Sequence, residues 1–316
     1  MVVQGKSIGD WKKRRVEILN GMQQIMGPVP GKEKRCALDV KIEEETDCGT
    51  YVRRLITYQS EPGSRVPAYL LIPKVALTNK KKCQAVLCLH PTDIADGNKT
   101  VVGLSPKENR GYAKELTERG YVTIAPAYPI MAKYNPDLKK LGYQSGTMKA
   151  IWDNMRALDL LESLPYVKRG NFAAIGHSLG GHNSIYTAVF DPRIKVIVSS
   201  CGFDSYLDYM GGKIAGWTQE RYMPKLANYS SSLETIPFDF HEMTGALAPR
   251  AFFVNAPTGD ANFKWQSVDR ILVTANQAYK LYGAEDKIHV EHPDCPHNFP
   301  DDVRQRAYDF IALNLK

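Results

Sequence analysis

The sequence predicts an α/β fold in which helices cover both faces of a mainly parallel, twisted sheet. Apolar strand-like runs alternate with helical patterns from residue 85 onward, and such alternation is typical of parallel βαβ units. Residues 50–59 and 66–72 flank a turn rich in Gly, Pro and Ser, which predicts an antiparallel hairpin at one edge. The 316 residues, 43% of them hydrophobic, suffice for one large domain with a modest insertion.

The first expected element is a helix over residues 10–25, where apolar residues recur with helical spacing. The Gly- and Pro-rich segment 27–31 ends it. We assign residues 1–49 to an N-terminal helical extension and residues 50–316 to the main domain. After the hairpin, the alternating pattern predicts a strand over 85–89, a helix over 109–119, a strand over 121–125 and a helix over 146–164.

The second half of the chain continues this pattern, with one interruption. A strand over 172–175, a helix around 184 and a strand over 194–199 come first. Residues 204–245 then break the alternation, because they are rich in Tyr, Met, Gly, Ser and Pro. We interpret this segment as a cap inserted over the carboxyl edge of the sheet. The alternation resumes with a strand over 251–255, a helix over 266–282, a strand over 288–291 and a helix from 302.

The pentapeptide Gly176-His177-Ser178-Leu179-Gly180 joins an apolar strand to a helix. A Gly-x-Ser-x-Gly turn in this context lifts the serine hydroxyl out of the backbone at the carboxyl edge of a sheet. The glycines are needed because side chains would collide with the neighbouring strand or helix. Ser178 is therefore the candidate nucleophile.

A serine hydroxyl is a weak nucleophile at neutral pH and needs an adjacent base. In this architecture the order along the chain is Ser, acid, His, with each residue on a loop after a strand. His297 lies in the loop that follows the last strand, so it is the candidate base. Asp260 follows the strand over 251–255 and is the candidate acid, with Asp204 in reserve.

Two backbone N–H groups should stabilise the developing oxyanion. We expect one from Leu179, directly after the nucleophile, and the other from the loop after the strand over 85–89. That loop reads His90-Pro91-Thr92, and since proline has no N–H, Thr92 is the expected donor. The cap should shape the substrate pocket, and the candidate lining residues are Tyr206, Tyr209, Met210, Trp217 and Tyr222.

Composition argues against a membrane-spanning protein and against a nucleic-acid-binding protein. No run of 18 apolar residues exists, and the net charge of +7 is dispersed apart from two basic clusters, Lys12–Arg15 and Lys80–Lys82. Each cluster is more typical of a solvated helix face or loop than of a nucleic-acid surface. The polar segment Met1–Lys13 lacks the apolar centre of a signal peptide, which favours a cytoplasmic location and leaves export open if a leader has been removed.

The six cysteines include no C-x-x-C pair, so no metal site is expected. Cys88 and Cys201 fall in apolar runs and should be buried thiols. A disulfide between Cys36 and Cys48 stays open for an oxidising compartment.

These residues resemble the α/β-hydrolase superfamily, and more narrowly its dienelactone hydrolase-like and acetyl xylan esterase-like members, over residues 50–316. The elbow around Ser178 is the specific part of the resemblance. Two departures stand out: dienelactone hydrolases proper carry a cysteine where Ser178 stands, and many relatives read His-Gly where this chain has His90-Pro91. The resemblance implies carboxylic ester hydrolysis through an acyl-enzyme, without metal or organic cofactor.

A serine esterase, with sugar or aryl esters as candidate substrates because aromatic faces stack on flat rings, is the first hypothesis. An acyl-thioester hydrolase or a small serine peptidase would use the same residues and remains the alternative. A third hypothesis is an inactive hydrolase fold that serves as a binding module, since fold alone does not establish activity. The oligomeric state is open.

Overall fold

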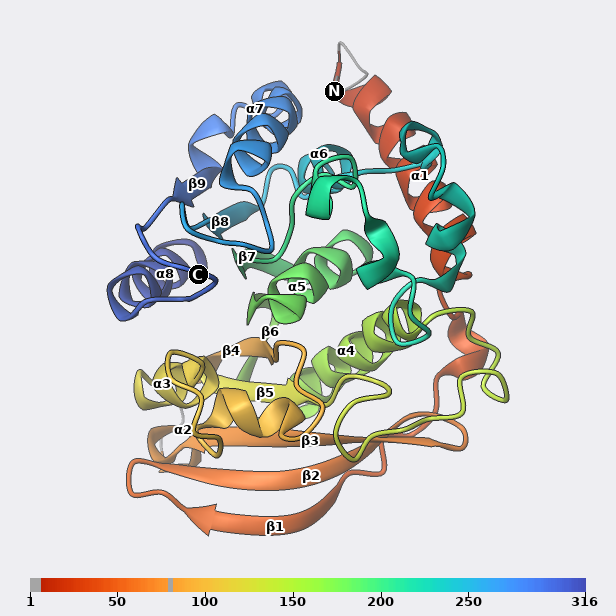
Figure 1. Ribbon diagram of the computed structural model, residues 1–316. Coiled ribbons are helices and arrows are strands. Elements are labelled where there is room, and N and C mark those ends of the chain that lie inside the picture. Colours follow the sequence, from red (N-terminus) through yellow and green to blue (C-terminus); the bar gives the residue numbers. More distant parts are fainter. Residues whose placement is uncertain (1–6, 79–81) are drawn as a thin grey trace.

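The computed structural model describes residues 7–78 and 82–316, and within them nine strands form one sheet in the order β1-β2-β3-β5-β4-β6-β7-β8-β9 (Figure 1). Every pair from β5 through β4 to β9 is parallel, whereas β1, β2, β3 and β5 pair antiparallel in succession. The expected fold class is confirmed. The strands are β1 (Lys41–Asp47), β2 (Tyr51–Glu61), β3 (Ser64–Pro73), β4 (Cys83–Leu89), β5 (Val122–Pro126), β6 (Val167–His177), β7 (Ile194–Ser200), β8 (Ala251–Asn255) and β9 (Ile288–Glu291).

Helices cover both faces of this sheet because the central strands are apolar on both sides. Along β4, Val86 and Cys88 join one buried cluster with α3 and α8, while Leu87 joins the other with α1, α4, α5 and α7. Alternate residues of a strand point to opposite faces, so one strand serves both clusters. The helices are α1 (Ile8–Met26), α2 (Lys74–Thr78), α3 (Tyr112–Glu118), α4 (Gly146–Ser163), α5 (Leu179–Phe190), α6 (Phe240–Gly245), α7 (Trp265–Leu281) and α8 (Asp301–Asn314).

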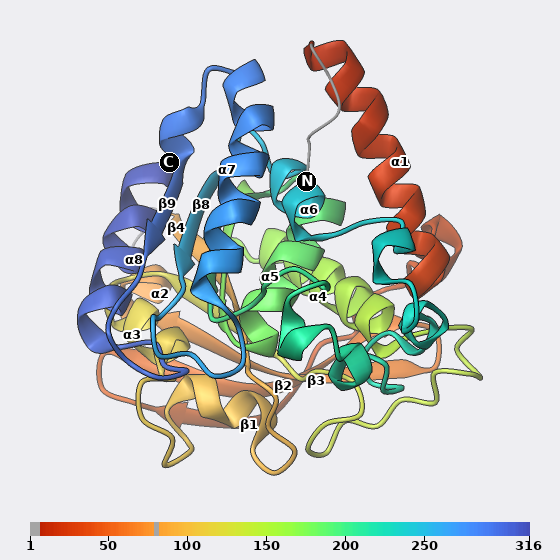
Figure 2. The same ribbon diagram turned by 45° about the horizontal axis from the view of Figure 1, so that its top comes forward.

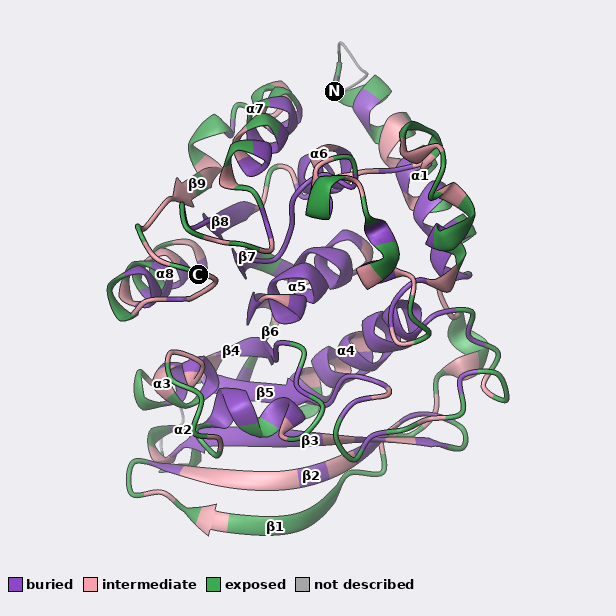
Figure 3. Cartoon of the chain, in the orientation of Figure 1, coloured by how far each residue is buried: buried purple, intermediate pink, exposed green. Residues whose placement is uncertain are grey.

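Strand β1 is the one strand among the described residues that the sequence pattern does not predict. It lies within the segment assigned to the N-terminal extension and pairs with β2 at the sheet edge. Its sequence, Lys-Ile-Glu-Glu-Glu-Thr-Asp, is almost wholly exposed, as the green β1 in Figure 3 shows. Charged side chains on an edge strand discourage pairing with other chains, and they also remove the apolar alternation that identifies a strand.

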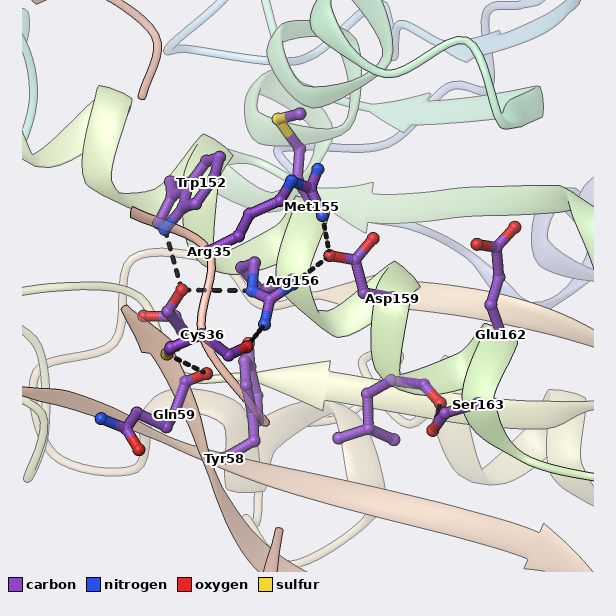
Figure 4. A network of polar contacts seen from close by, with 12 residues as sticks. Arg35, Cys36, Tyr58, Gln59, Trp152, Met155, Arg156, Asp159, Glu162 and Ser163 are labelled. Carbon is purple, nitrogen blue, oxygen red and sulfur yellow. Dashed lines mark hydrogen bonds and ion pairs between the residues drawn. The ribbon is translucent and has the colours of Figure 1, made fainter. Parts of the chain in front are cut away.

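The chain between α1 and β1 is fixed to helix α4 by a polar network (Figure 4). Arg156 on α4 donates to the carbonyl oxygens of Cys36 and Ser60, and Trp152 donates to the same Ser60 oxygen at 3.0 Å. Arg35 forms an ion pair with Asp159, one turn further along α4. These contacts hold the chain that connects α1 to β1 against α4.

The segment between β7 and β8 contains the expected interruption of the alternation. It forms four short 3-10 turns, at Tyr209–Gly211, Ile214–Trp217, Pro224–Tyr229 and Leu233–Thr235, followed by α6. Helix α1 lies beside this segment in both views (Figures 1 and 2). At Gly21 a Cβ would come within 2.8 Å of the Pro237 carbonyl oxygen, so glycine allows this close approach.

The structure also bears on the expectations about membrane spans, cysteines and basic clusters. None of the helices formed by the described residues is long and apolar enough to cross a bilayer. All six cysteines are free thiols, Cys36 and Cys48 included, and Cys88 and Cys201 are buried as expected. Lys80 and Lys81 of the second basic cluster, and the first six residues of the polar N-terminal segment, lie outside the described residues.

Candidate active site

Ser178 stands at the turn between β6 and α5 with φ 54° and ψ −123°, a left-handed conformation that a serine rarely adopts. Its amide donates to the Ser200 carbonyl oxygen at 2.8 Å, which ties the turn to β7. A Cβ on Gly176 would lie 2.1 Å from the Gly180 carbonyl carbon, and one on Gly180 would lie 2.0 Å from the Leu89 oxygen. The two glycines therefore permit the tight turn that exposes the serine.

His297 and Asp260 meet across the loops that follow β9 and β8. The Nδ1 atom of His297 lies 2.9 Å and 3.0 Å from the two carboxylate oxygens of Asp260. Asp260 Oδ1 also accepts from the amides of Asn262 and Phe263. Burial alone would raise the pKa of Asp260, but the bonds from His297 and the two amides outweigh it and lower that pKa below its ordinary value. The carboxylate is thus fixed in its ionised form.

The other histidines near the nucleophile have different partners. His177 places Nδ1 2.9 Å from Ser200 Oγ, and its ring lies 4.8 Å from that of His297. His182 stacks on Trp217 at 4.3 Å, and burial lowers its pKa to about 3. His292 has both ring nitrogens occupied, by the Ala256 carbonyl and by Asp269.

Asp204, the reserve acid, does not pair with His297. It is 2% exposed, and its Oδ2 accepts from the Lys264 amide at 3.1 Å. Its Oδ1 has no hydrogen-bond partner among the described residues, and burial raises its pKa to about 7. Asp204 therefore connects the start of the cap segment to the loop that carries Asp260.

A cavity of about 200 Å³ opens beside Ser178. Tyr209, Trp217 and Tyr222 line it, together with both expected oxyanion donors, and the remaining lining residues are Gly216, Gln219, Asn262 and Phe263. The Thr92 hydroxyl lies 2.9 Å from that of Tyr222, so the loop after β4 meets the segment between β7 and β8 here. None of the lining residues is charged.

Two residues expected in the pocket lining do not line this cavity, and the expectation is corrected for both. Tyr206 is 1% exposed and its hydroxyl lies 2.6 Å from that of Tyr186, in the aromatic packing behind the cavity. Met210 is 52% exposed and has a left-handed backbone (φ 49°).

The loop after β4, which carries the expected oxyanion donor Thr92, is held by His90 and Asp93. His90 Nε2 accepts from the Tyr128 amide at 2.9 Å, which leaves Nδ1 to donate to the Pro91 carbonyl at 2.7 Å. Burial lowers the pKa of His90 to about 4, so the ring is neutral and this pattern of bonds is fixed. Asp93 accepts from two loop amides, from Thr100 and from Lys107, which places Thr92 between two anchored neighbours.

Sequence reasoning missed two residues that hold the histidine loop. Arg110 precedes α3 and donates to Asn298 Oδ1 at 2.8 Å and to the His297 carbonyl at 3.4 Å. Asn255, the last residue of β8, donates to the Asn298 carbonyl at 2.9 Å. The polar Asn255 at the end of an apolar strand is a signal that could have been used. Arg110 has none, because its partners lie 187 and 188 positions away.

Cys201, Asp260 and His297 place one thiol, carboxylate or imidazole atom each within 4.8 Å of one another. Burial raises the pKa of the Cys201 thiol well above its ordinary value, so the thiolate that binds metals is disfavoured. His297 Nδ1 is already bonded to the carboxylate. We therefore assign no metal to this group.

Comparison with known proteins agrees with this geometry. The family model for glucuronyl esterases of fungi matches residues 137–283. "Putative hydrolase YtaP" of Bacillus subtilis is 24% identical over 308 residues, covering 94% of this chain and 98% of that protein. The 4-O-methyl-glucuronoyl methylesterase of Hypocrea jecorina is 24% identical over 203 residues, 57% of this chain and 43% of that enzyme.

Solved structures share the fold over nearly the whole chain. A glucuronoyl esterase from Solibacter usitatus superposes with a TM-score of 0.78 at 18% identity, covering 97% of this chain and 93% of that one. The expected resemblance to α/β-hydrolase esterases is thereby confirmed. The chain has the α/β-hydrolase fold, and the proteins to which it is similar include carboxylic ester hydrolases.

Proposed function

We propose that this protein hydrolyses carboxylic esters of sugar acids through an acyl-enzyme on Ser178. The observation that carries the proposal is the Asp260–His297 pair, 2.9 Å apart, whose imidazole lies 4.8 Å from the ring of His177. His177 directly precedes Ser178 in the strained turn, and Ser178 lines a cavity. His297 takes the Ser178 proton while Oγ attacks the ester carbonyl, and then gives that proton to the leaving alcohol. Water, deprotonated by the same imidazole, attacks the acyl-enzyme and releases the acid.

Each partner has one task in this scheme. Asp260 holds the proton of His297 on Nδ1, so that Nε2 is free to accept, and it stabilises the imidazolium that forms. The amides of Leu179 and Thr92 stabilise the oxyanion, and the location of both residues at the cavity supports this role. The anchored neighbours of Thr92 keep its amide in place without reorganisation during the reaction.

The cavity lining supports the choice of substrate class. Gln219 and Asn262 offer neutral hydrogen-bonding groups, and Trp217 offers an aromatic face on which a sugar ring can stack. An uncharged cavity suits a neutral ester better than the carboxylate that the reaction produces, which favours product release. The names of the similar glucuronoyl esterases point to the same class.

The test compares methyl glucuronate with p-nitrophenyl acetate as substrates for wild type, Ser178→Ala and a matched control, Ser230→Ala. Ser230 is exposed on the cap segment and donates only to the Ala227 carbonyl. We expect Ser178→Ala to lose about 10⁴-fold or more in kcat/KM and Ser230→Ala to match wild type. Equal turnover of both serine variants would overturn the proposal, and turnover of the acetate alone would overturn the sugar-acid part.

The reaction needs only ester and water, so neither a nucleic acid nor a membrane partner forms part of the proposal. A reducing, cytoplasmic compartment also belongs to it, supported by six free thiols. Cell fractionation tests the location, and recovery of the protein in the secreted fraction would contradict it.

A further inference from the structure

A second cavity, of about 600 Å³, lies between α1, the end of α5 and the residues that lead into β8. Its volume is within the range of small-molecule sites, about 300–1,000 Å³. Lys195, near the start of β7, and Arg250, directly before β8, belong to its lining. Ser178 follows the carboxyl end of β6, and β6, β7 and β8 are parallel, so the two cavities lie at opposite edges of the sheet.

This cavity is lined by four cations and no acid. The cations are Lys12 and Arg15 on α1, Lys195 and Arg250. Among residues 7–78 and 82–316, none of the four forms an ion pair with a carboxylate. Two arginines close to them in the sequence, Arg14 and Arg193, do form ion pairs with carboxylates.

Arg14, the neighbour of Arg15, pairs with Glu17 and with Glu242. Arg193, in the turn before Lys195, pairs with three acids, Asp159, Glu162 and Asp191. The chain thus neutralises the arginines on either side of the cavity and leaves the cavity itself positive. Lys12 and Lys195 are exposed, but Arg15 and Arg250 are partly buried. Partly buried charges are normally paired, so this contrast indicates that the partner of the two arginines comes from solution.

Hydrogen bonds hold Arg15 and Arg250 in place, and each arginine keeps one terminal nitrogen without a hydrogen-bond partner among the described residues. Arg15 donates through Nε and Nη2 to the Ala246 and Val189 carbonyls. Arg250 donates through Nε to the Leu247 carbonyl and through Nη1 to three carbonyls around the end of α5. Arg15 Nη1 and Arg250 Nη2 make no hydrogen bond with the described residues. Burial lowers the pKa of Arg250 to about 10; the Arg15 charge also acts to lower it, whereas Tyr279 and Asp191 act in the opposite direction.

The rest of the lining defines the body of the ligand. Seven apolar residues, among them Leu19 and Phe190, form the remainder of the cavity apart from Tyr282. A cavity with an apolar floor and a few convergent polar groups is typical of a site for an organic ligand. We propose that it binds an organic carboxylate, whose head group lies among the four cations and whose apolar body covers Leu19 and Phe190. This inference does not depend on the proposed ester hydrolysis.

The test is isothermal titration of the full chain with octanoate, using octanol as a tail-only probe and inorganic phosphate as a head-only probe. The variant Lys12→Ala/Lys195→Ala removes two exposed cations that cap no helix and take no part in the catalytic site. Lys13→Ala is the matched control, since Lys13 is an exposed neighbour on α1 outside the lining. Thermal unfolding without ligand checks that each variant folds as wild type does.

We expect one equivalent of octanoate to bind wild type and Lys13→Ala alike, and the double variant to bind it about tenfold more weakly or worse. Octanol and phosphate should bind more weakly than octanoate. The proposal is overturned if octanoate does not saturate the wild type, or if the double variant retains full affinity, as binding in the Ser178 cavity would produce. Octanol or phosphate binding as tightly as octanoate would also contradict it.

Discussion

The substitution Asp260→Asn tests the proposed triad with little change in shape. Asp260 Oδ1 accepts from the amides of Asn262 and Phe263 at 2.8 Å and 3.2 Å, so an asparagine there would keep its oxygen on this side. Its NH₂ group would then face His297 Nδ1, which now lies 2.9 Å from Oδ2. Two donors cannot bond to each other, so the imidazole would move its proton to Nε2 and could no longer accept the Ser178 proton.

The expected loss in kcat is about 10³- to 10⁴-fold, or about 4–5.5 kcal/mol of transition-state stabilisation. KM should change little, because Asp260 is absent from the cavity lining. Initial rates with a sugar-acid ester measure both constants, and Asp294→Asn, an exposed acid in the neighbouring loop, is the control. Activity of Asp260→Asn within tenfold of wild type, or an equal loss in Asp204→Asn, would refute the assignment.

Three further substitutions test the positioning of the histidine loop, the cavity lining and the stability contributed by Asp93. Arg110→Ala should lower kcat about 10- to 100-fold with KM nearly unchanged, because the arginine holds the His297 carbonyl and Asn298 in place. Arg110→Lys should recover part of the lost kcat. Unchanged steady-state kinetics of Arg110→Ala would contradict this role. Trp217→Ala should raise KM for sugar-acid esters more than for p-nitrophenyl acetate, since Trp217 lines the cavity, and an equal effect on both would exclude stacking. Burial opposes ionisation of Asp93, but Lys107 and the loop donors lower its pKa to about 2. Ionised Asp93 therefore stabilises the fold at pH values above its ordinary pKa of 3.8, and this stabilisation is lost as the pH falls toward 2. Urea unfolding of Asp93→Asn should therefore show a deficit of about 1 kcal/mol at pH 7 that shrinks between pH 4 and pH 2, and a deficit independent of pH would contradict this origin.

Most of the sheet could be predicted because its central strands are buried on both faces. Runs such as Phe172–Ile175 and Ala251–Val254 are continuously apolar, and this pattern is specific when helical segments separate the runs. Strand β1 could not be predicted, because an edge strand with four acidic residues carries no apolar alternation. What places it in the sheet is backbone pairing with β2, together with cross-strand contacts between Arg54 and Glu45 and between Thr57 and Glu43.

The residues of the candidate site likewise divide into those that the sequence predicts and those that it does not. Ser178, Asp260 and His297 follow from a local motif and from the order of loops along the chain, and the latter two lie within hydrogen-bond distance. The cap lining does not follow from sequence, since its 3-10 turns are only three to six residues long and too short to show a period in the sequence. Tyr206 therefore packs behind the cavity and Met210 faces solvent, although both lie in the same aromatic-rich segment as Trp217. Arg110 depends wholly on a long-range contact.

The most direct test of the central claim is to map the residue that a fluorophosphonate labels. We predict a single adduct, on the peptide that contains Ser178, in the wild-type enzyme. Labelling should vanish in Ser178→Ala and slow by at least about 10³-fold in His297→Ala, because the hydroxyl reacts only when an imidazole takes its proton. An adduct on another residue, or labelling of His297→Ala at the wild-type rate, would contradict the account.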